Sequence, residues 1–75
     1  MTETAQKDMI SVIVNGEARA VPAGSSLSAM LESIGLNPSK VAVERNLEVV
    51  PRSSLGEIEA CEGDQFEIVH FVGGG

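Results

Sequence analysis

One segment of the chain has the spacing of an amphipathic helix, and it lies among segments that are typical of strands. Its apolar residues recur at positions i, i+3, i+4 and i+7: Leu27, Met30, Leu31 and Ile34. Ser25 and Ser26 precede the stripe as candidate N-caps, whereas Gly35 and Pro38 follow it and favour its end. Because this is the one convincing helix, strands must bury the other apolar residues. We therefore predict a sheet with one helix across it.

The first strands form a predicted hairpin. A β-branched run at residues 10–14 ends at Asn15-Gly16, a dipeptide that favours a two-residue turn because both positions need positive φ. The return strand covers residues 17–21. A two-residue loop places Arg19 on the same face as the apolar residues of the first strand. Either the Arg19 stem covers the core while its head stays in water, or a bulge shifts the register.

The later strands complete a mixed sheet. Residues 41–45 and 48–50 read as two strands, and residues 65–72 read as a longer last strand. Leu55 and Ile58 could hold a short helical turn against the core. We expect the first and last strands to lie side by side and parallel in the centre, which is a β-grasp (ubiquitin-like) arrangement. The predicted fold is α+β, with a mixed sheet of four to five strands and one main helix packed across it.

Alternation along the last strand separates two faces. Phe66 and Ile68 point to one face, and Val69 and Phe71 point to the other. An exposed apolar patch often marks a partner site, so we expect Val69, Phe71 and Val72 to form a docking surface. The alternative is burial of this outer face under a loop or the helix.

Length and charge limit the class of protein. Seventy-five residues allow one domain; we predict an N-terminal extension at residues 1–8, the domain at 9–72 and a flexible glycine tail at 73–75. The net charge of −6 argues against nucleic-acid binding, which normally depends on a basic surface patch. It favours protein partners with basic surfaces. No signal peptide or membrane-length apolar run is visible, and a single cysteine allows no internal disulfide. We expect a cytoplasmic protein that binds no membrane.

Few side chains suit catalysis. His70 reads as a strand residue without a nucleophile beside it, and Cys61 has acidic neighbours that disfavour a reactive thiolate. Glu44 and Arg45 read as a solvated strand surface, and no residues have metal-ligand spacing. We therefore expect a protein that is not an enzyme, with no catalytic residues, no metal and no bound cofactor.

The last strand runs directly into Gly73-Gly74-Gly75. Glycine is costly to order, so such a triplet adds nothing to a fold. Its advantage is a small cross-section, because a tail without side chains can pass through a narrow channel into another protein's active site. The chemistry that suits it is activation of the Gly75 carboxylate by ATP to an acyl-adenylate, followed by sulfur attack that leaves a thiocarboxylate. The partners would have to supply every catalytic group.

Several segments together resemble the ThiS family of thiamine-biosynthesis sulfur carriers, over roughly residues 10–75. They are Val14-Asn15-Gly16-Glu17, residues 27–34, Val41-Ala42-Val43-Glu44-Arg45-Asn46 with Val49-Val50-Pro51-Arg52, and the ending from Glu62-Gly63-Asp64 to Gly75. One departure is Asn46-Leu47-Glu48, where the family usually has Asn-Gly-Glu.

The resemblance implies a reaction sequence. A ThiF-type enzyme would use ATP to adenylate Gly75, a cysteine desulfurase would supply sulfur, and a ThiG-type thiazole synthase would receive it. Gly74 carries over as the family's penultimate glycine, and Gly73 occurs in some members. Two alternatives stay open: the small subunit of molybdopterin synthase, which shares the fold and the tail, and a ubiquitin-like interaction or modifier module that is never thiolated.

Overall fold

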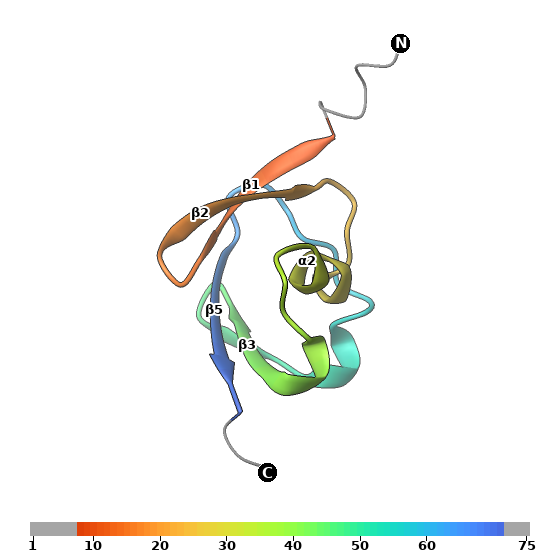
Figure 1. Ribbon diagram of the computed structural model, residues 1–75, viewed down its shortest axis with the longest axis vertical. Helices are drawn as coiled ribbons and strands as arrows, with labels where there is room; N and C mark the ends of the chain where they lie inside the picture. The colour runs from red at the N-terminus through yellow and green to blue at the C-terminus, as the bar shows by residue number, and fades with distance from the viewer. Residues whose placement is uncertain (1–7, 72–75) are drawn as a thin grey trace.

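The computed structural model describes residues 8–71, which form one sheet with one α-helix against it (Figure 1). The elements in chain order are β1 (Met9–Val14), β2 (Glu17–Pro22), helix α2 (Leu27–Ser33), the short 3-10 helix η1 (Pro38–Lys40), β3 (Val41–Arg45), β4 (Glu48–Val50), the 3-10 helix η2 (Arg52–Ser54) and β5 (Gln65–His70). The strand order β2-β1-β5-β3-β4 gives five strands, with β1 and β5 parallel in the centre, and confirms the prediction of a mixed β-grasp sheet of four to five strands.

The predicted ends of the chain lie largely outside the described residues. Of the predicted extension at residues 1–8, the structure describes Asp8 alone, and it describes neither Val72 nor the tail at residues 73–75. Within residues 8–71, no helix is long and apolar enough to cross a membrane.

The first hairpin has the predicted register. Asn15 and Gly16 take φ of 50° and 86°, and Val12 pairs with Arg19 as a two-residue turn requires. No bulge shifts the pairs, which run without interruption to the ends of both strands. The Arg19 side chain keeps 44% of its surface exposed and lies 3.9 Å from a Glu17 carboxylate oxygen. The first alternative therefore holds, in which Arg19 keeps its charged head in water.

The Asn15 side chain fastens the hairpin turn to the central strand. Its Oδ1 accepts a hydrogen bond from the Ile68 N–H at 2.8 Å, and its Nδ2 donates to the Ile68 carbonyl at 3.1 Å. Strands β1 and β5 pair directly through only two residues each. The side chain thus extends a short parallel ladder by imitating a backbone partner.

Helix α2 begins and ends at the predicted signals. The Ser26 hydroxyl accepts a hydrogen bond from the Ala29 N–H at 3.1 Å, which is the expected N-cap. At the other end Gly35 takes φ of 89°, and the N–H groups of Gly35 and Leu36 donate to carbonyls of the last turn, closing a Schellman motif. The helix buries Leu27, Met30 and Leu31 completely.

The core lies between α2 and one face of the sheet. It is aliphatic apart from Phe66, as the composition predicts, and the largest fully buried side chains are Phe66, Leu27, Met30, Leu31, Val12, Val21 and Val41. Leu55, in the turn that follows η2, is also buried and confirms that this segment is held to the core.

The last strand is shorter than predicted. We expected it to run to residue 72, but β5 ends at His70. The reason is its partner, because β3 begins at Val41, which pairs with His70. A single further bond, from the Phe71 N–H to the Lys40 carbonyl at 3.0 Å, continues the line of the strand.

Candidate functional site

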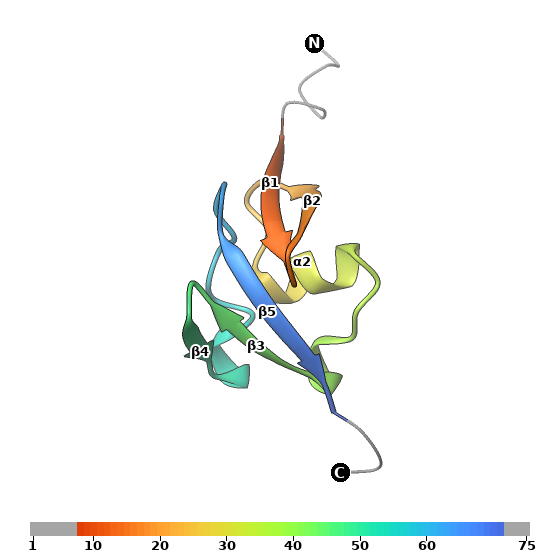
Figure 2. The same ribbon diagram turned by 90° about the vertical axis from the view of Figure 1, so that its left-hand side faces the viewer.

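The face of the sheet opposite α2 is turned toward the viewer in Figure 2. It carries exposed apolar side chains. Val69 is 63% exposed and Phe71 is 51% exposed, so neither is buried under a loop or helix of the described part. Val49 on β4 is 72% exposed, and Ala42 on β3 pairs directly with Val69. This apolar surface across β5, β3 and β4 is called the outer face below.

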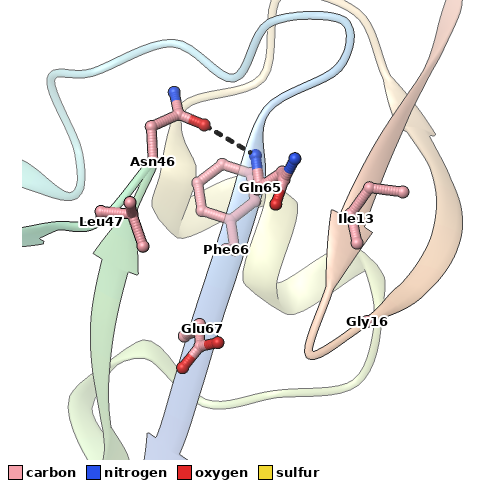
Figure 3. A pocket seen from close by; sticks show the side chains of 7 residues that line it. All are labelled: Ile13, Gly16, Asn46, Leu47, Gln65, Phe66 and Glu67. Carbon is pink, nitrogen blue, oxygen red and sulfur yellow. Dashed lines mark hydrogen bonds between the residues drawn. The ribbon is translucent and has the colours of Figure 1, made fainter.

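Two hollows lie on the outer face. A shallow one of about 110 Å³ is lined by Ala42, Val43, Glu44, Val49, Glu67 and Val69. A larger one of about 340 Å³ lies between the first hairpin and the β3–β4 turn, and is lined by Ile13, Gly16, Asn46, Leu47, Gln65, Phe66 and Glu67 (Figure 3). Because Glu67 lines both, the hollows adjoin each other. The outer face is therefore an indented apolar surface with a carboxylate near its middle.

The end of β5 is held on two sides. The Phe71 N–H is bonded to the Lys40 carbonyl, and the Arg52 guanidinium carbon lies 5.1 Å from the centre of the Phe71 ring. At this distance a guanidinium over an aromatic face is attracted by the ring's charge distribution. The chain therefore leaves the sheet from a fixed point beside the outer face. The roles predicted for Val72 and for Gly73, Gly74 and Gly75 fall on residues outside the described part and stay predictions.

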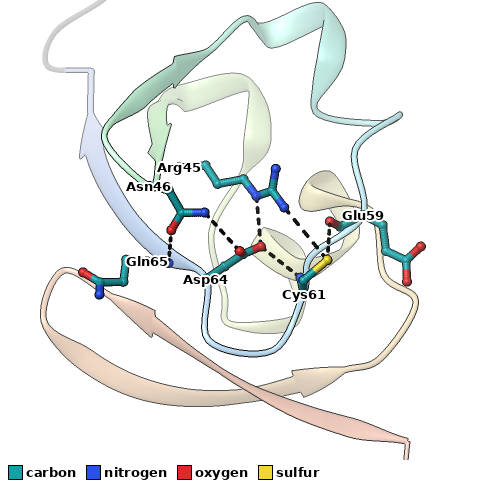
Figure 4. Close-up of polar contacts among 6 residues, drawn as sticks. All are labelled: Arg45, Asn46, Glu59, Cys61, Asp64 and Gln65. Atoms are coloured by element: carbon teal, nitrogen blue, oxygen red, sulfur yellow. Dashed lines mark hydrogen bonds and ion pairs between the residues drawn. The ribbon is translucent and has the colours of Figure 1, made fainter.

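A buried carboxylate holds the other end of β5 (Figure 4). Asp64 is 6% exposed and accepts hydrogen bonds from Arg45 Nε at 2.9 Å, from Asn46 Nδ2 at 3.2 Å and from the Cys61 N–H at 2.9 Å. The expectation that Arg45 lies on a solvated surface was wrong, since its side chain is 29% exposed and pairs with Asp64. Side chains alternate along β3, so Arg45 lies on the same inner side as Val41 and Val43. This alternation could have shown from the sequence that Arg45 is partly buried.

The cluster shifts the ionisation of both charged partners. Burial raises the pKa of Asp64, but the hydrogen bonds from the Cys61 N–H, Arg45 and Asn46 outweigh it and hold that pKa below its ordinary value. The hydrogen bond to Asp64 raises the pKa of Arg45 further above neutrality. Asp64 is therefore ionised at neutral pH and acts as a structural anchor.

The same cluster fixes the β3–β4 turn. The Asn46 N–H donates to the Gln65 carbonyl at 2.7 Å, and Asn46 Oδ1 accepts from the Gln65 N–H at 3.0 Å. With the bond to Asp64, three hydrogen bonds join this turn to the beginning of β5. Asn46 and Leu47 take φ of 51° and 74°, so the turn has the conformation that an Asn-Gly sequence would favour although it contains leucine.

The described side chains do not assemble a nucleophile with a base. Cys61 is exposed, with its Sγ 3.9 Å from Arg45 Nη2, in the loop before β5. His70 lies at the opposite end of that strand. Within residues 8–71, no three His, Cys, Asp or Glu side chains come together in a way that could hold a metal ion. What the described residues offer is an exposed apolar face beside Phe71, which is held at the end of β5.

Comparison with known proteins decides the family. The model of the ThiS family matches residues 12–75. The chain belongs to the ThiS family. The sulfur carrier protein ThiS of Bacillus subtilis is 44% identical over 50 residues, which cover 67% of this chain and 76% of that protein. The crystal structure of the thiamine biosynthesis protein ThiS from Geobacter metallireducens superposes with a TM-score of 0.72 at 28% identity, covering 88% of this chain and all of that one.

A longer relative contains a segment like this ThiS-family chain. The thiazole synthase of Paramagnetospirillum magneticum is 46% identical over 66 residues, which cover 88% of this chain and 20% of that protein. The chain thus spans about one fifth of the length of that relative.

Proposed function

We propose that this ThiS-family chain carries sulfur for thiamine biosynthesis as a thiocarboxylate on Gly75. One observation carries the proposal: the central strand of the fold is held at Phe71, beside an exposed apolar face, four residues before the last glycine of the sequence. Four residues follow Phe71 in the sequence, and a stretch of that length spans at most about 14 Å when fully extended. A partner docked on the outer face could therefore receive the tail in its own active site.

The proposed chemistry begins with ATP bound by a ThiF-type adenylating enzyme. The Gly75 carboxylate attacks the α-phosphorus, pyrophosphate leaves, and an acyl-adenylate forms. The outer sulfur of a persulfide, derived from a cysteine desulfurase, then attacks the carbonyl carbon, and AMP leaves with its oxygen. A thiol reductant cleaves the S–S bond of the resulting acyl disulfide with two electrons, which leaves the thiocarboxylate on Gly75. The chain supplies the electrophilic carbon and the docking face and acts as a co-substrate, with no catalytic residue of its own.

Delivery to a ThiG-type thiazole synthase is the proposed next step. It is supported by the 46% identity between this chain and a segment of a protein named thiazole synthase. The thiocarboxylate sulfur is ionised at neutral pH, so it can attack an electrophilic carbon of the acceptor bound in the synthase. Val69, Phe71 and Val72 are the proposed docking residues, and Gly73 and Gly74 are the proposed threading segment.

The destination of the sulfur separates this proposal from its alternatives. The thiocarboxylated chain is incubated with a thiazole synthase and its organic substrates, and in parallel with the large subunit of a molybdopterin synthase and its precursor. We expect the chain to lose its sulfur, and its intact mass to return to that of the carboxylate form, in the incubation with the thiazole synthase. In the incubation with the molybdopterin synthase subunit, its mass should stay that of the thiocarboxylate. Sulfur loss with the molybdopterin subunit alone would contradict delivery to thiazole. Isopeptide-linked adducts of the chain on larger proteins would instead indicate a modifier.

A further inference from the structure

Leu47 combines a backbone and a side-chain feature that are both unfavourable in the free protein. Its φ of 74° lies in the left-handed region, which favours glycine, and its side chain is 89% exposed. Leucine in this position therefore gains almost no burial in return for the strained backbone. A strained residue that the fold holds in place is a reason to look for a function.

The turn cannot relax to relieve this strain. Asn46 is bonded to Gln65 through both its backbone N–H and its side chain, and to the buried Asp64 carboxylate through Nδ2. These contacts fix the residue next to Leu47 from three sides. The leucine side chain is consequently held at the rim of the 340 Å³ hollow, across from Ile13 (Figure 3).

A pair of like charges lies beside this rim. Glu44 on β3 and Glu67 on β5 are direct cross-strand partners, and both line the smaller hollow. Like charges directly opposite each other destabilise a sheet. Among the described residues, ion pairs join Arg19 to Glu17 and Arg45 to Asp64, so neither of these two glutamates is neutralised there.

We propose that the outer face docks a protein whose surface presents an apolar pocket bordered by a lysine or arginine. Leu47 enters the pocket as an anchor, and the cationic side chain lies between Glu44 and Glu67. Docking would bury the Leu47 side chain, which is exposed in the free chain, and would neutralise the repulsion between the two glutamates. The net charge of −6 also favours a partner with a basic surface. This inference rests on the proposed function and adds the chemistry of the partner's docking site; the partner to test is the ThiF-type adenylating enzyme.

The anchor is tested with Leu47→Gly, measured by calorimetric titration against that enzyme. A buried leucine is worth roughly a 10- to 100-fold change in affinity, so we expect the Kd to rise by that factor. The thermal midpoint should stay the same or rise, because glycine adopts positive φ without strain. Met9→Ala, which truncates another exposed apolar residue at the far end of β1, should leave the Kd unchanged. An unchanged Kd for Leu47→Gly overturns the anchor.

The charge requirement is tested with the double variant Glu44→Gln and Glu67→Gln. We expect weaker binding than wild type at low salt, with the difference shrinking at high salt as the ion pairs are screened. Equal or tighter binding at low salt overturns the proposed cation.

Failure of this inference differs from failure of the proposed function. At saturating enzyme, the Leu47→Gly chain should still become thiocarboxylated, because its tail is intact. If the wild-type chain is thiocarboxylated but Leu47→Gly binds the enzyme with the wild-type Kd, the docking inference alone is contradicted. A wild-type chain that neither binds the enzyme nor gains sulfur contradicts both.

Discussion

Removing Gly75 from the 75-residue chain should nearly abolish thiocarboxylate formation and leave the fold intact. The deletion withdraws the carboxylate by about 3.5 Å, and a misplacement of even about 1 Å at a reacting atom can lower a rate by roughly 100-fold. We therefore expect at least that loss in the initial rate of sulfur incorporation, measured by intact mass. The thermal midpoint should not change, since the sheet and core lie within the described residues 8–71.

Gly74→Leu and Gly74→Ala separate the length of the tail from its width. Both variants keep the carboxylate at its original distance, but they add a large and a small side chain where a narrow channel would admit none. We expect a rate loss for leucine close to that of the deletion and a smaller one for alanine. Undiminished thiocarboxylation of the chain without Gly75 contradicts the carrier role, and full activity of Gly74→Leu contradicts threading through a narrow channel.

Replacing Asp64 with alanine should cause a large loss of stability. The variant leaves Arg45 without its carboxylate and removes acceptors from the Asn46 amide and the Cys61 N–H. Removing one partner of a buried ion pair lowers the free energy of unfolding by roughly 3–5 kcal/mol. Because Arg45 is partly exposed, we expect a smaller loss here, of about 2–4 kcal/mol. Urea unfolding at pH 7 measures this difference, and the thermal midpoint should fall by about 10 °C or more.

Asp64→Asn serves as the matched variant, because it keeps the shape and one acceptor oxygen but removes the charge. The pKa of Asp64 in the folded state lies below its value of about 3.9 in the unfolded state. The ionised carboxylate therefore contributes its full stabilisation of the fold above about pH 3.9, and this stabilisation is lost as the pH falls through the folded-state pKa. The stability gap between wild type and Asp64→Asn should therefore be constant from pH 5 to pH 7 and shrink below about pH 4. A gap that does not depend on pH would contradict the ionised anchor.

Local sequence was sufficient for the first hairpin and the helix. Asn15-Gly16 is one of few dipeptides that take positive φ at both positions, and this fixes the register without reference to the rest of the chain. The helix likewise depends on neighbouring residues, from the Ser26 cap to Gly35. Where a structure is decided within a few residues, the prediction was confirmed.

Features that depend on contacts between distant segments were harder to predict. Alternation alone places Arg45 beside the core, but its partner Asp64 is 19 residues later and becomes a neighbour only through the sheet order. The end of β5 depends on where β3 begins, and a pattern within β5 cannot report that. Leu47 occupies a turn position that favours glycine because the bonds of Asn46 override the local preference.

The candidate docking residues were predictable in part. The alternation of Phe66 and Ile68 with Val69 and Phe71 assigned the correct face, and exposure of the latter pair agrees with it. The contributions of Val49 and Leu47 were not predicted, because a short edge strand and a turn carry too little pattern to assign a face. Val49 lies on the outer face because it pairs with Glu44, and Leu47, in the turn between β3 and β4, lines the larger hollow.

The intact mass of the chain after reaction tests the central claim most directly. The 75-residue chain is incubated with a ThiF-type adenylating enzyme, ATP and a cysteine-derived sulfur source, and the modified residue is located by fragmentation. The account predicts a gain equal to the replacement of one oxygen atom by one sulfur atom, located at Gly75 and absent when ATP is omitted. An unchanged mass, with an enzyme that thiocarboxylates an established carrier under the same conditions, would contradict it.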